Sequence, residues 1–159
     1  MLKVKLITVG TLKEDYLRAA TAEYEKRLSA FCRFEQVQLT EEKLPELPSQ
    51  NEIKAALDRE AIKITEQISS SAFCVALCVE GKQLSSEELA DKLEAISMDR
   101  SEIVFVIGSS YGLSDAVKQR ADMKLSISRL TFPHQLMRPI LLEAVYRAFN
   151  IQKGTKYHK

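Results

Sequence analysis

"AFCVALCV" (residues 72–79) is an unbroken apolar run near the middle of the chain, and "EIVFVIG" (102–108) is a second, nearly unbroken one. A strand with one face in water alternates apolar and polar side chains, whereas a continuous apolar strand is buried on both faces. Such strands are typical of parallel sheets that have helices packed on each side. The two runs therefore predict central strands of an α/β fold.

The segments around these two runs alternate between strand and helix patterns. Further strands are predicted at 3–10, 34–39 and 123–130. Apolar residues at three- and four-residue spacing predict helices at 13–31, 51–69, 85–98 and 113–121, followed by one last helix near the C-terminus. The helix at 85–98 opens with a capping box, Ser85 with Glu88 three residues on. This order predicts a single α/β domain over residues 1–159, with a largely parallel sheet flanked by helices.

The composition fits one compact domain. The chain has 159 residues, of which 45% are hydrophobic and 28% charged, so a sizeable core is expected. No run approaches the roughly 18 apolar residues of a membrane-spanning helix. The apolar start at residues 2–10 is broken by lysines and lacks the pattern of a cleavable signal. We therefore expect a cytoplasmic protein without a membrane partner.

The cysteines and histidines do not form a metal motif. Cys32, Cys74 and Cys78 are odd in number and lack paired metal spacing, and the only histidines are His134 and His158. Cys74 and Cys78 lie an even number of residues apart in an apolar run, so a strand turns both to one face. We expect buried, inert thiols and no metal site.

Charge is distributed unevenly along the chain. Residues 116–159 carry nine Lys and Arg against two Asp and Glu, which gives +7, and the remainder therefore carries −6 within a total of +1. A basic C-terminal third favours a polyanionic partner, although a merely solvated surface gives the same composition.

The last helix is unusual in two respects. Between Pro139 and Asn150 its charged and amide side chains form one narrow stripe, so most of its circumference is apolar. Such a helix packs either against a second copy of the chain or inside the monomer. Pro133 suits a helix start, but Pro139 removes an interior hydrogen bond, which predicts a kink or a helix that restarts at Pro139.

Three loops follow the carboxyl ends of predicted strands, where parallel α/β sheets bind ligands, namely 79–87, 107–115 and 127–135. In the second loop, Gly108 and Gly112 allow positive φ or close approach of a ligand, or form an ordinary tight turn. In the third, Pro133 keeps the preceding residues extended, so their backbone groups need partners. An adenine-like ligand has hydrogen-bond donors and acceptors that could serve as these partners.

The motifs "FVIGSSYGL", "LSISRLTFPHQLMR", "EAVYRAFNI" and the terminal "KYHK" resemble the ribosomal RNA large-subunit methyltransferase H family, which is of the SPOUT class. The resemblance runs from "KVKLITVGTLK" to the last residue. It implies S-adenosylmethionine as cofactor, a C-terminal trefoil knot and a homodimer joined partly through the last helix. It also implies methylation of N3 of a pseudouridine in large-subunit rRNA, with the assembled ribosome as the expected partner.

The resemblance also implies site residues. Cofactor contacts fall on Leu77, Gly108, Ile127, Ser128, Arg129, Leu130, Thr131 and Phe132. The expected catalytic residues are His158 as a proton acceptor, Tyr157 as a stacking residue and Arg138, which alternatively forms a structural ion pair. Phosphate contacts are expected from Lys153, Lys156 and Lys159.

His134 is interpreted as a helix-start residue that satisfies local backbone groups, and not as the base. Two other functions remain open, a SPOUT methyltransferase acting on tRNA and a non-enzymatic ribosome-binding dimer.

Overall fold

Five parallel strands form one sheet in the computed structural model, which describes residues 1–159. The sheet order is β2-β1-β4-β3-β5, and every pairing is parallel. The strands are β1 (Lys3–Val9), β2 (Arg33–Leu39), β3 (Phe73–Gln83), β4 (Glu102–Ile107) and β5 (Met123–Ser126). The sequence-based α/β prediction is confirmed, and β4 and β3 lie inside the sheet.

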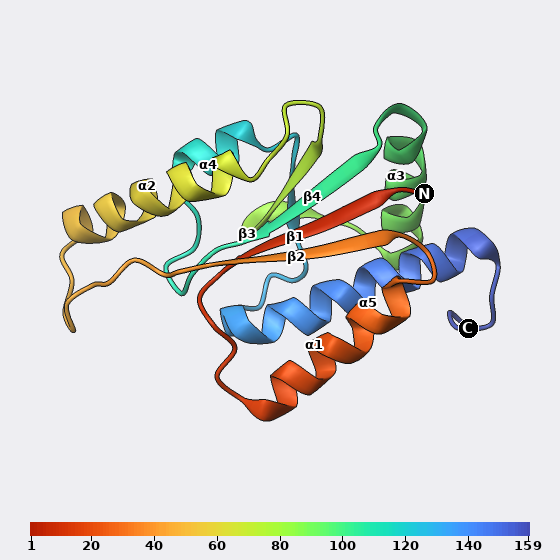
Figure 1. The fold of residues 1–159 in the computed structure, drawn as a ribbon, viewed down its shortest axis with the longest axis horizontal. Helices are drawn as coiled ribbons and strands as arrows, with labels where there is room; N and C mark the ends of the chain where they lie inside the picture. Colours follow the sequence, from red (N-terminus) through yellow and green to blue (C-terminus); the bar gives the residue numbers. More distant parts are fainter.

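Helices cover both faces of this sheet (Figure 1). They are α1 (Asp15–Leu28), α2 (Gln50–Glu66), α3 (Ser86–Asp99), α4 (Asp115–Arg120) and α5 (His134–Lys153). One core lies beneath α1, α3 and α5, and a second lies beneath α2 and α4. β4 places Ile103 and Phe105 in the first core and Val104 and Val106 in the second. The apolar run is thus buried on both faces, as its composition predicts.

Serine side chains begin three of the helices. The Oγ of Ser85 accepts the backbone N–H of Glu88 at 3.0 Å, which confirms the predicted start of α3. A complete capping box is found instead at α2, between Ser49 and Glu52. At α4 the Oγ of Ser114 accepts the backbone N–H of Val117 at 3.3 Å. These caps satisfy N–H groups that have no partner within the helix.

The two strands nearest one edge depart from their predicted lengths. β5 ends at Ser126 and not at residue 130, so residues 127–133 leave the sheet. β3 continues past residue 79 to Gln83 after a register shift, and both Leu77 and Lys82 pair with Leu125. At Gly81 an added Cβ would lie 2.7 Å from the Leu125 backbone, so only glycine allows this close approach.

α5 is one continuous helix from His134 to Lys153, and Pro139 lies inside it. Of the two sequence-based alternatives, a kink or a restart, the restart at Pro139 is therefore wrong. Pro139 leaves the Gln135 carbonyl without its intrahelical donor, but the turns on either side continue. Pro133 is the N-cap, with φ −54° and ψ 134°, and its carbonyl accepts the Met137 N–H at 3.2 Å. Pro133 thus separates the extended segment 127–132 from the helix.

α5 packs between α1 and α3 within the chain (Figure 1). Leu141, Leu142, Val145 and Ala148 are each at most 2% exposed in the single chain. The monomer itself therefore covers most of the apolar circumference of α5, as the second of the two sequence-based alternatives states. None of the five helices combines the length and the apolar character needed to cross a membrane.

Candidate active site

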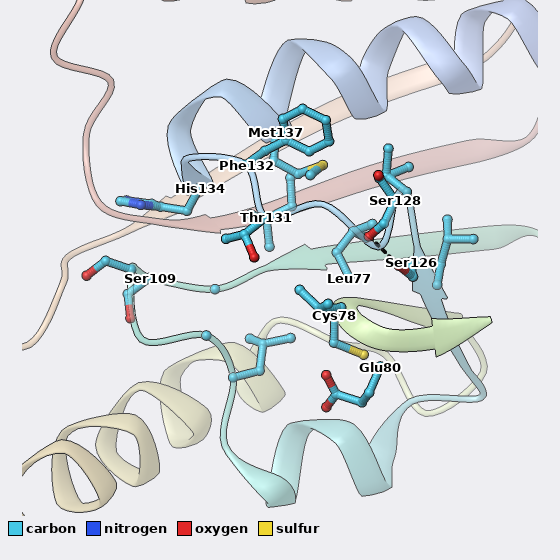
Figure 2. Close-up of a pocket in the computed structure, with 18 of the residues that line it drawn as sticks. Leu77, Cys78, Glu80, Ser109, Ser126, Ser128, Thr131, Phe132, His134 and Met137 are labelled. Carbon is cyan, nitrogen blue, oxygen red and sulfur yellow. Dashed lines mark hydrogen bonds between the residues drawn. The ribbon is translucent and has the colours of Figure 1, made fainter. Parts of the chain in front are cut away.

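A cavity of about 290 Å³ lies beside the register shift of β3 and the carboxyl ends of β4 and β5 (Figure 2). These three strands are neighbours in the sheet, so the loops that follow their carboxyl ends meet. Residues from all three predicted loops line the cavity, including Val79, Gly108 and Phe132, and Leu77 of β3 lines it as well. The expected cofactor residues are thus brought together with one exception, Arg129, which is exposed and does not line the cavity.

The glycine loop after β4 forms one wall. The N–H of Gly112 donates to the Ser109 carbonyl at 2.8 Å, which closes a tight turn, and Gly112 has φ +88°. Gly108 has a different reason to be glycine, because an added Cβ would lie 2.2 Å from the Gly112 carbonyl oxygen. The interpretation of this loop as a tight turn is confirmed, and the turn lines the cavity.

The segment 127–132 forms the opposite wall and has backbone groups without partners. No hydrogen bond within the protein involves the backbone N–H or C=O of Ile127, Thr131 or Phe132. Ser126 Oγ donates to the Ser128 carbonyl at 2.9 Å, and Ser128 Oγ accepts the Leu130 N–H at 3.0 Å. These two hydrogen bonds stabilise the conformation of the segment, and the other backbone groups remain available to a ligand.

An ion pair that sequence reasoning missed also lines the cavity. Lys118 Nζ on α4 lies 2.5 Å from Glu80 Oε1, which lies in β3 at the register shift between Leu77 and Lys82. The hydrogen bond lowers the pKa of Glu80 and raises the pKa of Lys118, so both groups are charged near neutral pH. Glu80 lies in the stretch 79–87 that the sequence predicts as a loop, of which residues 79–83 belong to β3, whereas Lys118 has no local sequence signal.

His134, the first residue of α5, also lines the cavity. Neither ring nitrogen has a hydrogen-bond partner in the protein, so the expectation that this residue satisfies local backbone groups is wrong. Burial lowers the pKa of His134 below its ordinary value. The imidazole is therefore mainly neutral at pH 7.

Arg138 lies outside the cavity and is 2% exposed. Its guanidinium donates to the carbonyl oxygens of Gly10 at 2.6 Å and Val9 at 3.4 Å, and to Gln38 Oε1 at 3.0 Å. These bonds tie α5 to the carboxyl ends of β1 and β2. Arg138 has no carboxylate partner, so the alternative of a structural ion pair is wrong.

The C-terminal tail folds back on its own chain and does not line the cavity. Tyr157 OH donates to Glu143 Oε1 at 3.1 Å, and the Tyr157 ring lies 4.7 Å from the Arg147 guanidinium carbon. Burial, with the contacts to Tyr24 and Glu143, raises the pKa of Tyr157 to about 12. Tyr157 therefore stays protonated near neutral pH.

Both ring nitrogens of His158 are engaged. Nε2 lies 2.7 Å from Glu87 Oε1, and Nδ1 lies 3.2 Å from Arg147 Nη1. The hydrogen bond from His158 lowers the pKa of Glu87. The three lysines of the tail are exposed and make no ion pair, which leaves them available to phosphates: Lys153, Lys156 and Lys159.

Two of the three cysteine thiols are buried. Burial raises the pKa of Cys32 and of Cys74 to about 11 in each case, which makes both poor nucleophiles near neutral pH. Cys78 is only partly buried and borders the cavity, so the prediction that all three are buried is wrong for Cys78. No group of three or more His, Cys, Asp or Glu side chains is arranged to hold a metal ion.

The sequence of the chain matches a known class of enzyme. Residues 2–158 match the family model described as "Predicted SPOUT methyltransferase". The chain is 51% identical to the ribosomal RNA large subunit methyltransferase H of Streptococcus thermophilus (strain ATCC BAA-491 / LMD-9), over 99% of this chain and 100% of that protein. It is 50% identical, with the same coverage, to the protein of that name from Bacillus pumilus (strain SAFR-032). The chain therefore belongs to the ribosomal RNA large subunit methyltransferase H family of SPOUT methyltransferases.

Proposed function

We propose that this methyltransferase transfers the methyl group of S-adenosylmethionine to N3 of a pseudouridine in large-subunit ribosomal RNA. The observation that carries the proposal is the set of unpaired backbone groups in segment 127–132, whose residues, apart from Arg129, line the 290 Å³ cavity. An adenine edge offers both donors and acceptors, which backbone C=O and N–H groups complement. The cavity volume lies at the low end of the roughly 300–1,000 Å³ range of ligand pockets.

The other residues of the cavity also fit this cofactor. Leu77, Phe132 and Met137 offer apolar surface for the faces of the purine ring. Glu80 and Lys118 offer one charge of each sign, as a methionine group with an ammonium and a carboxylate requires. When bound, the cofactor supplies an electrophilic methyl group on a sulfonium. Gly108 and segment 127–132 would hold it in one orientation and exclude water.

The chemistry requires orientation and removal of one proton. Methyl transfer is an in-line displacement, so the enzyme gains most by aligning the nucleophile with the methyl group. N3 of pseudouridine is a weakly acidic imide nitrogen, and a base that takes its proton makes it nucleophilic. Tyr157 and His158 are proposed to contact the RNA. Arg138 is proposed to act by holding α5 and not by touching substrate.

Recognition of RNA is proposed to involve a homodimer and the basic tail. Val79, Tyr111 and Leu130 border the cavity and are 54%, 47% and 71% exposed, so a second copy of the chain would bury apolar surface there. The tail packs on α5. In a dimer joined partly through α5, the tail would therefore lie close to the interface between the two copies. We also propose that the C-terminal part of the chain forms the trefoil knot implied by the family. The protein is proposed to act in the cytoplasm, where the ribosome is.

The test is methyl transfer from labelled S-adenosylmethionine to assembled ribosomes, free large subunits and naked rRNA, with the labelled nucleotide mapped. We expect label at one pseudouridine in assembled ribosomes. Equal labelling of a free stem-loop would contradict recognition of the assembled particle. Cofactor binding without label on rRNA would favour a tRNA substrate, and absence of cofactor binding would favour a non-enzymatic ribosome-binding dimer.

A further inference from the structure

The two histidines of the chain lie in opposite environments. His158 is held on the surface of α3 and α5, and both of its ring nitrogens are engaged by Glu87 and Arg147. His134 lines the cavity, and both of its ring nitrogens are without a partner. Within one chain, only His134 therefore has a nitrogen lone pair available to a ligand of the cavity.

The position of His134 is fixed by rigid neighbours. It is the first residue of α5 and follows Pro133, whose ring restricts the backbone before the helix. Arg138, one turn further on, anchors the helix to the carbonyl oxygens of β1. In the cavity, His134 lies on the side of the glycine-loop residue Ser109, away from Glu80 (Figure 2). The imidazole thus lies away from the ion pair that suits the methionine group.

Burial favours the neutral form of His134, and the charged groups around it act in both directions. Burial is the largest cause of its lowered pKa. Glu41, in the loop after β2, raises the pKa, whereas Arg138 of α5 and Lys13 of the loop after β1 lower it. The positive end of the α5 dipole acts in the same direction as the two cations. A histidine of this kind is deprotonated at pH 7 and is ready to accept a proton.

We propose that His134 is the general base that removes the N3 proton of the substrate pseudouridine, an inference that rests on the function proposed above. As the N3–H proton moves to a ring nitrogen of His134, the N3 electron pair forms the new bond to the methyl carbon. The carbon–sulfur bond breaks and its electron pair stays on sulfur, which leaves S-adenosylhomocysteine neutral. His134 then releases the proton to water. His158, which the sequence analysis assigned as proton acceptor, acts instead in holding RNA.

The first test needs neither cofactor nor RNA. A chain with two histidines gives two imidazole Cε1–H resonances in NMR, and His134→Gln and His158→Gln assign them by removing one each. We expect the His134 resonance to titrate below pH 6.5 in the unliganded protein. Titration of His134 above pH 7 would overturn the inference, because more than half of the imidazole would then be protonated at pH 7.

The second test follows single-turnover methyl transfer against pH for the wild type and both variants. For His134→Gln we expect a loss of about 10²–10⁴-fold at pH 7, the usual contribution of general base catalysis. Cofactor affinity by calorimetry should be retained, and the low-pH inflection should disappear. The loss should shrink as pH rises, because the imide then ionises without a base. His158→Gln is the matched control and should keep the inflection even if it is slower.

The outcomes separate this inference from the proposed function. If the wild type labels no rRNA, the proposed function fails. If the wild type labels rRNA and His134→Gln keeps the wild-type pH profile, only the base assignment fails. A loss in His134→Gln that is equal at every pH would also overturn the inference, since a residue that merely positions substrate gives that result.

Discussion

Substitution of Gly108 by alanine tests whether the glycine loop shapes the cofactor cavity. The added Cβ would lie 2.2 Å from the Gly112 carbonyl oxygen, 2.6 Å from its carbonyl carbon and 2.9 Å from Leu113 Cδ2. Two of these contacts are with backbone, so no change of rotamer relieves them. To reach 3.0 Å from the oxygen, the loop must open by about 0.8 Å.

This displacement has a calculable cost in stability and binding. Overpacking of this kind costs about 1–3 kcal/mol of unfolding free energy, which for a chain of this size lowers Tm by about 2–12 °C. A wall displaced by nearly 1 Å also loses hydrogen bonds to the ligand. Loss of about 1–3 kcal/mol of binding free energy weakens cofactor affinity by about 5- to 150-fold. We expect both effects together in Gly108→Ala.

The assay combines calorimetric titration with S-adenosylmethionine and thermal unfolding followed by circular dichroism. Gly154→Ala is the matched control, because Gly154 has φ +67°, no atom within 4 Å of an added Cβ, and a location at the end of α5 far from the loop. It should lose about 1–2 kcal/mol of stability through backbone strain and keep its cofactor affinity. If Gly108→Ala binds the cofactor as tightly as the wild type, the assignment of this loop to the cofactor is refuted.

Three further predictions concern other parts of the molecule. Arg138→Ala should lower the unfolding free energy by about 3 kcal/mol, because it removes a buried side chain and leaves the carbonyl oxygens at the end of β1 without their donor. Chemical denaturation measures this change, and an unfolding midpoint equal to that of the wild type would contradict the prediction. The next prediction concerns the three lysines of the tail, Lys153, Lys156 and Lys159. Replacing all three by glutamine should reduce the slope of log affinity for rRNA against log salt concentration by about 2 to 3. An unchanged slope would exclude phosphate contacts by these residues. Cys74, with a pKa of about 11, has about one thiolate in a thousand at pH 8, so it should resist a thiol reagent in the native protein and react after unfolding.

The element order was predictable because its signals are local. The apolar runs at 72–79 and 102–108 identify the buried strands, and Ser85 with Glu88 marks a helix start that the structure confirms. The effect of Pro139 was not predictable. Packing of α5 against α1 and α3 outweighs the single hydrogen bond that the proline removes, so the helix continues through it.

The members of the cavity were predictable in part. Gly108 and segment 127–132 follow strand ends, and parallel strands direct their carboxyl ends to one edge, so their convergence follows from the pattern. Lys118 could not be found in this way, because its pairing with Glu80 joins residues 38 positions apart. The β4-β3-β5 order decides that these two side chains meet.

The sequence by itself determined the fold class, the family and the loops that form the cavity, because periodicity, turn chemistry and motifs are encoded over short stretches of chain. The tertiary structure alone decided the environments of its charged and titratable groups. Arg138 reaches Gly10 across 128 residues, and His158 reaches Glu87 across 71. Hydrogen bonds and burial at such separations depend on how distant elements pack, and they distinguish the free imidazole of His134 from the engaged one of His158.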